Sequence, residues 1–172
     1  SMIVVPIAVN EGETVVASGT TGETLTWMLT SDGTLTISGE GAMPHYQFDY
    51  DFYEPIVPWL RYRSQVIKVV IEDGVTNVGQ YAFYEHQKMQ EVVIGNDVES
   101  IGQLAFSHSN HVQKLTIGSG LKSVDSMAFN GWVRLEELYI SDLAAWCEIE
   151  FTDGPPCGWE GEYVDATYMY LN

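Results

Sequence analysis

The chain has 172 residues, the size of one domain, and 45% of them are hydrophobic, so it can bury a core without obligatory disulfides. Its 24 acidic and 7 basic side chains give a formal net charge of -17, which argues against nucleic acid and anionic membrane surfaces as partners, because both are bound through clustered lysine and arginine. No apolar run reaches the length of roughly 18 residues that a membrane-spanning helix requires.

Residues 23–39 are the first segment with a clear structural period. Apolar residues alternate with polar ones on both sides of Ser31-Asp32-Gly33, a sequence typical of a tight turn. We therefore expect a β-hairpin, and we expect it to cap the repeat array that follows. The alternating apolar residues are Leu25, Trp27, Leu29, Leu35 and Ile37.

The segment 46–53 is rich in aromatic residues that alternate with polar and acidic ones. One interpretation is an added strand whose rings cover the end of the core. The other is an aromatic platform for a sugar or a peptide, because aromatic side chains offer large contact areas at low entropic cost. Trp132, in the repeats, is a second binding candidate and would equally fill a gap in the core. The tentative binding residues are Tyr46, Phe48, Tyr50, Phe52, Tyr53 and Trp132.

A 23-residue repeat occupies the middle of the chain. Columns of isoleucine, valine and leucine recur at this interval, and so does an Ala-Phe pair. Full units span 66–88, 89–111 and 112–134, and a fourth begins at Leu135. The predicted core residues of the repeat are Ile71, Phe83, Ile94, Ile101, Phe106, Ile117, Phe129 and Ile140.

Each unit is predicted to form one coil of a solenoid. In the second unit, 89–94 ends in the two-residue alternation of a half-buried strand, a Gly-Asn-Asp turn follows at 95–97, and 98–101 forms a second extended piece. We expect the segment with Ala105-Phe106 to form one helical or 3₁₀ turn. No unit can bury its apolar residues alone, so the units must stack, with neighbouring strands about 4.8 Å apart.

The outward position at the start of each strand alternates in charge. Lys68, Glu91, Lys114 and Glu137 occupy it in successive units. Opposite charges on adjacent strands attract each other by roughly a few tenths of a kcal/mol. We therefore interpret these four residues as structural rather than as ligand-binding.

The unit L-x-x-[VIL]-x-I…V-x-x-I-G-x-x-A-F resembles the BspA-type leucine-rich repeat of bacterial surface proteins, and the likeness is strong over 66–143. Residues 18–43 and 139–147 are similar to segments that often precede and interrupt such arrays. The resemblance implies an α/β fold, a right-handed leucine-rich-repeat solenoid of short strands and helical turns, with the N-terminal β-hairpin as its cap.

The chain departs from this family pattern at two places. Where the family usually has a small residue, often cysteine, the three units carry His86, Ser109 and Trp132, so the edge of the core must be packed differently. The segment 44–58 is also longer and more aromatic than the family pattern leads us to expect.

A short helix and an irregular tail are predicted after the repeats. Ser141-Asp142 can cap a helix that runs through Trp146, because an aspartate side chain accepts hydrogen bonds from free helix N–H groups. Residues 152–166 are rich in glycine, proline and acidic side chains and are predicted to be irregular. Tyr168 to Asn172 looks like the start of a further strand.

Motifs of catalysis are absent from the sequence. It has no G-x-S-x-G, no Walker loop and no H-E-x-x-H. His108 and His111 have no third metal ligand nearby in the sequence. Asp49, Asp51 and Glu54 resemble half of a calcium loop but lack its glycine and its terminal glutamate. We therefore predict no catalytic residues, no metal and no cofactor.

The two cysteines leave two interpretations open. Cys147 and Cys157 flank a Gly-Pro-Pro sequence, and their spacing fits no metal or redox motif. They are either two reduced thiols or a disulfide that closes a loop in an exported protein.

The sequence favours recognition over catalysis. We divide the chain into a β cap with an aromatic insertion at 1–65, a solenoid at 66–151 and an acidic tail with the start of a further strand at 152–172, all in one structural domain. The family resemblance implies a non-catalytic extracellular or cell-surface module, its signal peptide already removed, that adheres to host protein or to another cell. The alternatives are a carbohydrate-binding module that uses 46–53, and a structural spacer in a larger surface protein. Acidic side chains gather outside the repeats, so a partner steered by charge should be neutral or basic.

Overall fold

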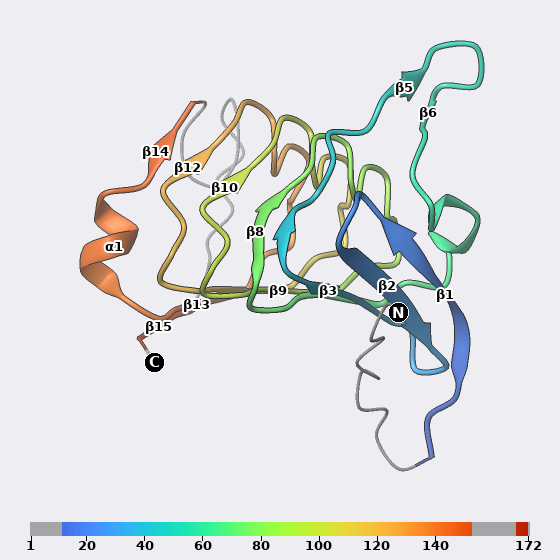
Figure 1. The fold of residues 1–172 in the computed structure, drawn as a ribbon. Coiled ribbons are helices and arrows are strands. Elements are labelled where there is room, and N and C mark those ends of the chain that lie inside the picture. Colours follow the sequence, from blue (N-terminus) through green and yellow to red (C-terminus); the bar gives the residue numbers. More distant parts are fainter. Residues whose placement is uncertain (1–11, 153–167, 172) are drawn as a thin grey trace.

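The computed structural model describes residues 12–152 and 168–171, and over these residues the chain is a solenoid of stacked coils (Figure 1). Their strands form two large sheets and a small separate one. Sheet A has the order β1 (Val15–Thr21), β2 (Leu25–Thr30), β3 (Thr34–Gly39), β7 (Lys68–Ile71), β9 (Glu91–Ile94), β11 (Lys114–Ile117), β13 (Glu137–Ile140) and β15 (Tyr168–Leu171). Sheet B has the order β14 (Glu150–Phe151), β12 (Ser123–Val124), β10 (Ser100–Ile101), β8 (Val75–Val78) and β4 (Gly41–Ala42).

The 23-residue repeat sets the register of the parallel strands. Residues one repeat apart are direct neighbours on adjacent strands of both sheets. Because the sequence columns and the strands share this interval, each column presents the same kind of side chain to the core at every level. The predicted solenoid of 23-residue repeats is therefore confirmed. One such column in sheet A is Val69, Val92, Leu115 and Leu138, and one in sheet B is Val78, Ile101 and Val124.

The β-hairpin predicted over 23–39 forms, with β2 and β3 antiparallel, but it does not form the predicted cap. β1, β2 and β3 are antiparallel neighbours, and β3 then runs parallel to β7, with Leu35 beside Val69. β4 also pairs in parallel, with β8 of sheet B. β3 and β4 thus already belong to a coil, and the antiparallel strands continue sheet A at its edge. The alternating pattern identified the strands, but alternation carries no information on whether a pair closes over a core or extends a sheet.

A ladder of aromatic rings runs through the core. Phe83, Phe106 and Phe129 stack at successive levels, with centroids 5.1 and 5.8 Å apart and interplanar angles of 12° and 3°. Trp59 extends the ladder at 5.4 Å from Phe83, and its Nε1 donates a hydrogen bond to the carbonyl of Ala82 (2.9 Å). The repeat residues expected in the core are all buried, namely Ile71, Phe83, Ile94, Ile101, Phe106, Ile117, Phe129 and Ile140.

The segment around each Ala-Phe pair is a series of turns, and the predicted helical turn is wrong. In each of the three full repeat units, the residue before the alanine and the second residue after the phenylalanine have positive φ. A left-handed residue on each side interrupts a right-handed helix. The N–H groups bond to the next coil instead, as Phe83 does to Ala105 (2.7 Å). The φ values are 59° at Tyr81, 55° at Leu104 and 56° at Met127, then 57° at Glu85, 60° at His108 and 86° at Gly131.

Replacing Gly131 by alanine should lower the free energy of unfolding by about 1–2 kcal/mol. Gly131 has a φ of 86°, and a Cβ there would lie 2.7 Å from Oδ1 of Asn110. Urea denaturation followed by circular dichroism measures the change. The control is Gly12→Ala, at another positive φ, where a Cβ would meet nothing within 4 Å and the loss should be smaller. Equal losses in the two variants would contradict the packing part of this argument.

Helices contribute little to the described residues, and the regular structure of these residues is nearly all strand rather than α/β. They are the 3₁₀ helix η1 (Leu60–Tyr62) and α1 (Leu143–Cys147). The predicted cap of α1 is confirmed, since the Asp142 carboxylate accepts hydrogen bonds from the N–H groups of Ala144 and Ala145. No helix within 12–152 or 168–171 is long and apolar enough to cross a membrane. The tail predicted to be irregular lies almost entirely outside the described residues.

The charge alternation on sheet A forms ion pairs over its first three positions. Glu91 lies between two lysines, with Oε1 3.2 Å from Nζ of Lys68 and 3.7 Å from Nζ of Lys114. At the fourth position, Glu137 accepts a hydrogen bond from the Tyr139 hydroxyl (2.9 Å), and Lys114 lies 4.9 Å from the centre of the Tyr139 ring. These side chains are partnered within the sheet, which fits the structural role predicted for them.

Candidate functional site

An arm of two short strands projects from the first coil (Figure 1). Its strands β5 (Phe48–Asp49) and β6 (Glu54–Pro55) are antiparallel and form a sheet of their own. The arm is an insertion: Leu35 and Val69 are neighbours on β3 and β7 although 34 residues separate them, against 23 for the neighbours on β7 and β9. The excess explains why 44–58 is longer than the repeat pattern predicts.

The tip of the arm is ordered and highly exposed. The Asp49 carboxylate accepts hydrogen bonds from the N–H groups of Asp51 and Phe52, at 2.9 and 3.3 Å, which fixes the turn. Three aromatic side chains there, which we call the arm tip, are each about three-quarters exposed. They are Tyr50, Phe52 and Tyr53, at 73%, 76% and 76%.

The base of the arm packs on aromatic side chains of the second coil, which the repeat unit 66–88 forms. The Phe48 ring lies 5.2 Å from Tyr81 and 5.5 Å from Tyr84, and Tyr50 lies 5.3 Å from Phe48. Tyr84 also contacts the ring of His108 in the next coil, at 5.2 Å. These rings form one contiguous cluster along the edge of the coils. We call it the aromatic surface, and its members are Phe48, Tyr50, Tyr81, Tyr84 and His108.

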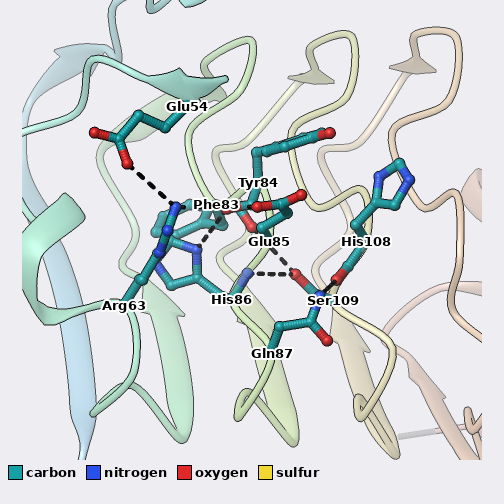
Figure 2. Close-up of polar contacts among 9 residues, drawn as sticks. All are labelled: Glu54, Arg63, Phe83, Tyr84, Glu85, His86, Gln87, His108 and Ser109. Carbon is teal, nitrogen blue, oxygen red and sulfur yellow. Dashed lines mark hydrogen bonds and ion pairs between the residues drawn. The ribbon is translucent and has the colours of Figure 1, made fainter. Parts of the chain in front are cut away.

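Acidic side chains lie beside part of the aromatic surface. Glu54 and Glu85 flank Arg63, whose Nη1 lies 3.7 and 4.0 Å from their oxygens, and Figure 2 shows this group beside Tyr84 and His108. Asp49 and Asp51 add two further acidic side chains, and neither has an ion pair among the described residues. Burial, followed by the charges of Glu85 and Tyr81, raises the pKa of Tyr84, so its phenol stays neutral.

A buried histidine lies beneath this group. His86 is fully buried, and its Nδ1 lies 3.2 Å from the Tyr84 carbonyl. Its main-chain N–H donates to Oγ of Ser109 (3.2 Å), which donates in turn to the Phe83 carbonyl (Figure 2). Nε2 is buried without a hydrogen-bond partner among the described residues. Desolvation, with a smaller effect of the Arg63 charge, lowers the pKa of His86 to about 4.

The structure separates the six residues that the sequence singled out for binding. Tyr46 is buried, its hydroxyl lies 2.6 Å from Oγ1 of Thr21, and burial raises its pKa to about 12. Trp132 is buried as well, and its Nε1 donates to the Phe106 carbonyl (2.9 Å). These two side chains belong to the core. The other four lie on the arm, with Phe48 half-buried and Tyr50, Phe52 and Tyr53 exposed.

Three members of the aromatic surface escaped prediction from the sequence. Tyr81, Tyr84 and His108 stand in repeat columns whose other members are not aromatic, such as Leu104 and Met127 in the column of Tyr81. The sequence could have identified these three residues because each differs in type from the residues at the same position of the other repeats. That difference is visible only after the repeats have been aligned. Their meeting with Phe48 depends on where the insertion folds, and the repeat says nothing about that.

Other hollows of the solenoid are less distinctive. A groove of about 490 Å³ runs over the ends of the sheet A strands and is lined by Val70, Val93 and Asn96 among others. A second, of about 630 Å³, lies beside β4 and β8, near His45 and Thr76. Neither is lined by phenylalanine, tyrosine or tryptophan. Within the described residues, no three His, Cys, Asp or Glu side chains are placed to hold a metal ion. Cys147 is free and exposed, and Cys157 lies outside the described residues.

Comparisons with known proteins agree with the fold. A model of the BspA type leucine rich repeat region matches residues 61–148, in six copies. The chain is similar to a leucine-rich repeat protein from Eubacterium ventriosum ATCC 27560, solved at 2.50 Å resolution, with a TM-score of 0.56 and 25% identity over 80% of this chain and 41% of that one. A leucine rich cell surface protein from Faecalibacterium prausnitzii A2-165 matches with a TM-score of 0.39 and 20% identity, over 80% of this chain and 43% of that one. The chain thus spans about two fifths of each of these proteins. No curated protein sequence matches it.

Proposed function

The chain belongs to the BspA-type leucine-rich repeat family, and from this premise we propose that it is a non-catalytic recognition module that binds a protein on a host or on another cell. A rigid stack of coils holds side chains at fixed spacings, which suits binding to an extended surface. The repeat fold alone does not name a ligand, so the function must be argued from the surface that this chain presents.

The observation that carries the proposal is the exposure of the arm tip. Aromatic residues exposed by about three quarters are unusual on a soluble domain, because removing such surface from water is strongly favourable. Tyrosine and tryptophan are also the residues that dominate the binding energy of protein interfaces. Asp49 orders the turn in advance, so a partner would lose little conformational entropy in binding the tip.

We place this activity outside the cell, at the cell surface or in secreted form. The family resemblance supports this location. The strongly acidic composition would help to keep a protein with an exposed aromatic arm in solution. A partner would meet the arm at the end of the solenoid away from α1 (Figure 1).

The test is a binding screen with a triple variant. The chain is applied to immobilised extracellular-matrix and cell-surface proteins and, in parallel, to a glycan array. We expect at least one protein to bind, and we expect Tyr50→Ser, Phe52→Ser and Tyr53→Ser together to weaken that binding at least about tenfold. The matched control is Val15→Ser with Val16→Ser, which removes exposed apolar side chains from β1 and should leave binding intact.

Three outcomes would count against the proposal. One is that no protein binds. Another is that a protein binds equally well to the triple variant, which would place its site elsewhere. The third is that only glycans bind and that the triple variant loses them, which would make the chain a carbohydrate-binding module.

A further inference from the structure

We infer that the aromatic surface binds a cationic polypeptide segment, whose arginine or lysine side chains lie over the tyrosine rings and beside the nearby carboxylates. This inference rests on the proposed function, because it names the chemistry of the protein partner. It adds a ligand class, and it adds residues of the coils to those of the arm.

The first argument is the chemistry of the rings. A cation is attracted to the face of a tyrosine or phenylalanine ring within roughly 6 Å of its centre. Tyr50, Tyr81 and Tyr84 gather around Phe48, so several rings are within reach of one extended segment. The chain makes the same contact internally, where Lys114 lies 4.9 Å from the centre of Tyr139 and Arg61 lies 5.8 Å from that of Tyr62.

The second argument is the sign of the local charge. Glu54 and Glu85 lie beside Tyr84 with Arg63 between them, and Asp49 and Asp51 are the sequence neighbours of Phe48 and Tyr50 on the arm. Nη1 of Arg63 is 3.7 and 4.0 Å from the two glutamates and makes no hydrogen bond within the part of the chain that is described. The carboxylates are therefore only loosely neutralised and can accept further cations. A net charge of -17 over the whole chain steers a basic partner in and repels an acidic one.

The experiment uses labelled decaarginine as the probe, with decaglutamate and the neutral sugar cellohexaose as comparisons. Binding is measured by fluorescence anisotropy at about 150 mM salt. At this concentration the Debye length is about 8 Å, so long-range electrostatic attraction is largely screened. We expect decaarginine to bind and the other two probes not to bind. Tyr81→Leu with Tyr84→Leu removes two rings without changing the charge, and it should weaken binding about two- to fivefold for each ring lost. Tyr84→Phe keeps the ring and should keep the affinity.

Matched controls separate the surface from the acidity of the whole chain. Tyr139→Leu removes a ring on sheet A, far along the sequence, and should not change the affinity. Asp49→Asn with Asp51→Asn should weaken binding more than Glu148→Gln with Glu150→Gln, which removes the same charge beside α1. Circular dichroism verifies that each variant is folded. Equal effects of the two charge pairs, or no effect of the paired leucine substitutions in folded protein, would overturn the inference, as would binding of cellohexaose in place of decaarginine.

Failure here is distinguishable from failure of the proposed function. If a protein partner depends on the arm tip but decaarginine does not bind, the recognition function stands and its assigned ligand chemistry is wrong. If neither a protein nor decaarginine binds, both proposals fall together.

Discussion

Phe106→Ala should lower the free energy of unfolding by about 3–5 kcal/mol, the loss typical of truncating a buried phenylalanine. Phe106 is fully buried and lies between Phe83 and Phe129 in the ring ladder. Because each coil packs only on its neighbours, the cavity left by the ring cannot be filled by a shift of one coil without breaking strand pairing on both sides. Urea denaturation followed by tryptophan fluorescence measures the loss.

The matched control for this prediction is Phe52→Ala. It makes the same chemical change at the arm tip, where the side chain is 76% exposed, and should alter stability by about 0.5 kcal/mol or less. A small loss for Phe106→Ala would mean that the coils collapse onto the cavity and that the ladder is not a rigid stack.

The buried His86 should make the chain less stable in mild acid. Its pKa is lowered by burial from 6.5 to about 4, so between these values the unfolded chain takes up a proton that the folded chain does not. Above pH about 6.5 the imidazole is neutral in both states, and its protonation does not affect folding. As the pH falls towards 4, protonation of the unfolded chain lowers the free energy of unfolding by about 3 kcal/mol. Arg63 opposes protonation with its positive charge, and Glu54 and Glu85 flank that arginine.

Comparison with His86→Leu isolates this effect, because the two proteins differ in this one ionisable group. The stability of wild type relative to His86→Leu should fall by about 3 kcal/mol between pH 7 and pH 4. A constant difference between wild type and His86→Leu over this range would show that the histidine is hydrated in the folded chain.

The sequence was informative wherever a physical constraint repeats. A column such as Val69, Val92 and Leu115 must face the core at every level, so its 23-residue spacing predicts both the strands and their register. The cap of α1 was predictable because Asp142 acts on N–H groups only two and three residues away.

The sequence was misleading where non-glycine residues adopt backbone conformations that they usually avoid. The sequence of the compact segment around Ala105-Phe106 is compatible with a helix, yet Leu104 and His108 adopt left-handed conformations. Neither residue is a glycine, so the sequence gives no sign of these conformations. The non-glycine side chains remain because the main chain bonds to neighbouring coils on both sides, a constraint that a single unit does not reveal. The aromatic surface could not be predicted for a related reason. Phe48 contacts Tyr81 and Tyr84, but it lies on an insertion whose position the repeat does not determine.

The insertion that forms the arm has a consequence for how such chains diversify. It adds 11 residues to the span between β3 and β7, which still pair in the same parallel arrangement as the later strands. Lengthening a loop costs only about 0.6 kcal/mol for each doubling of its length. Stability is therefore set by the coils, while the arm is free to change in length and composition. Related chains can acquire new partners by exchanging this one segment, with every coil beneath it left as it was.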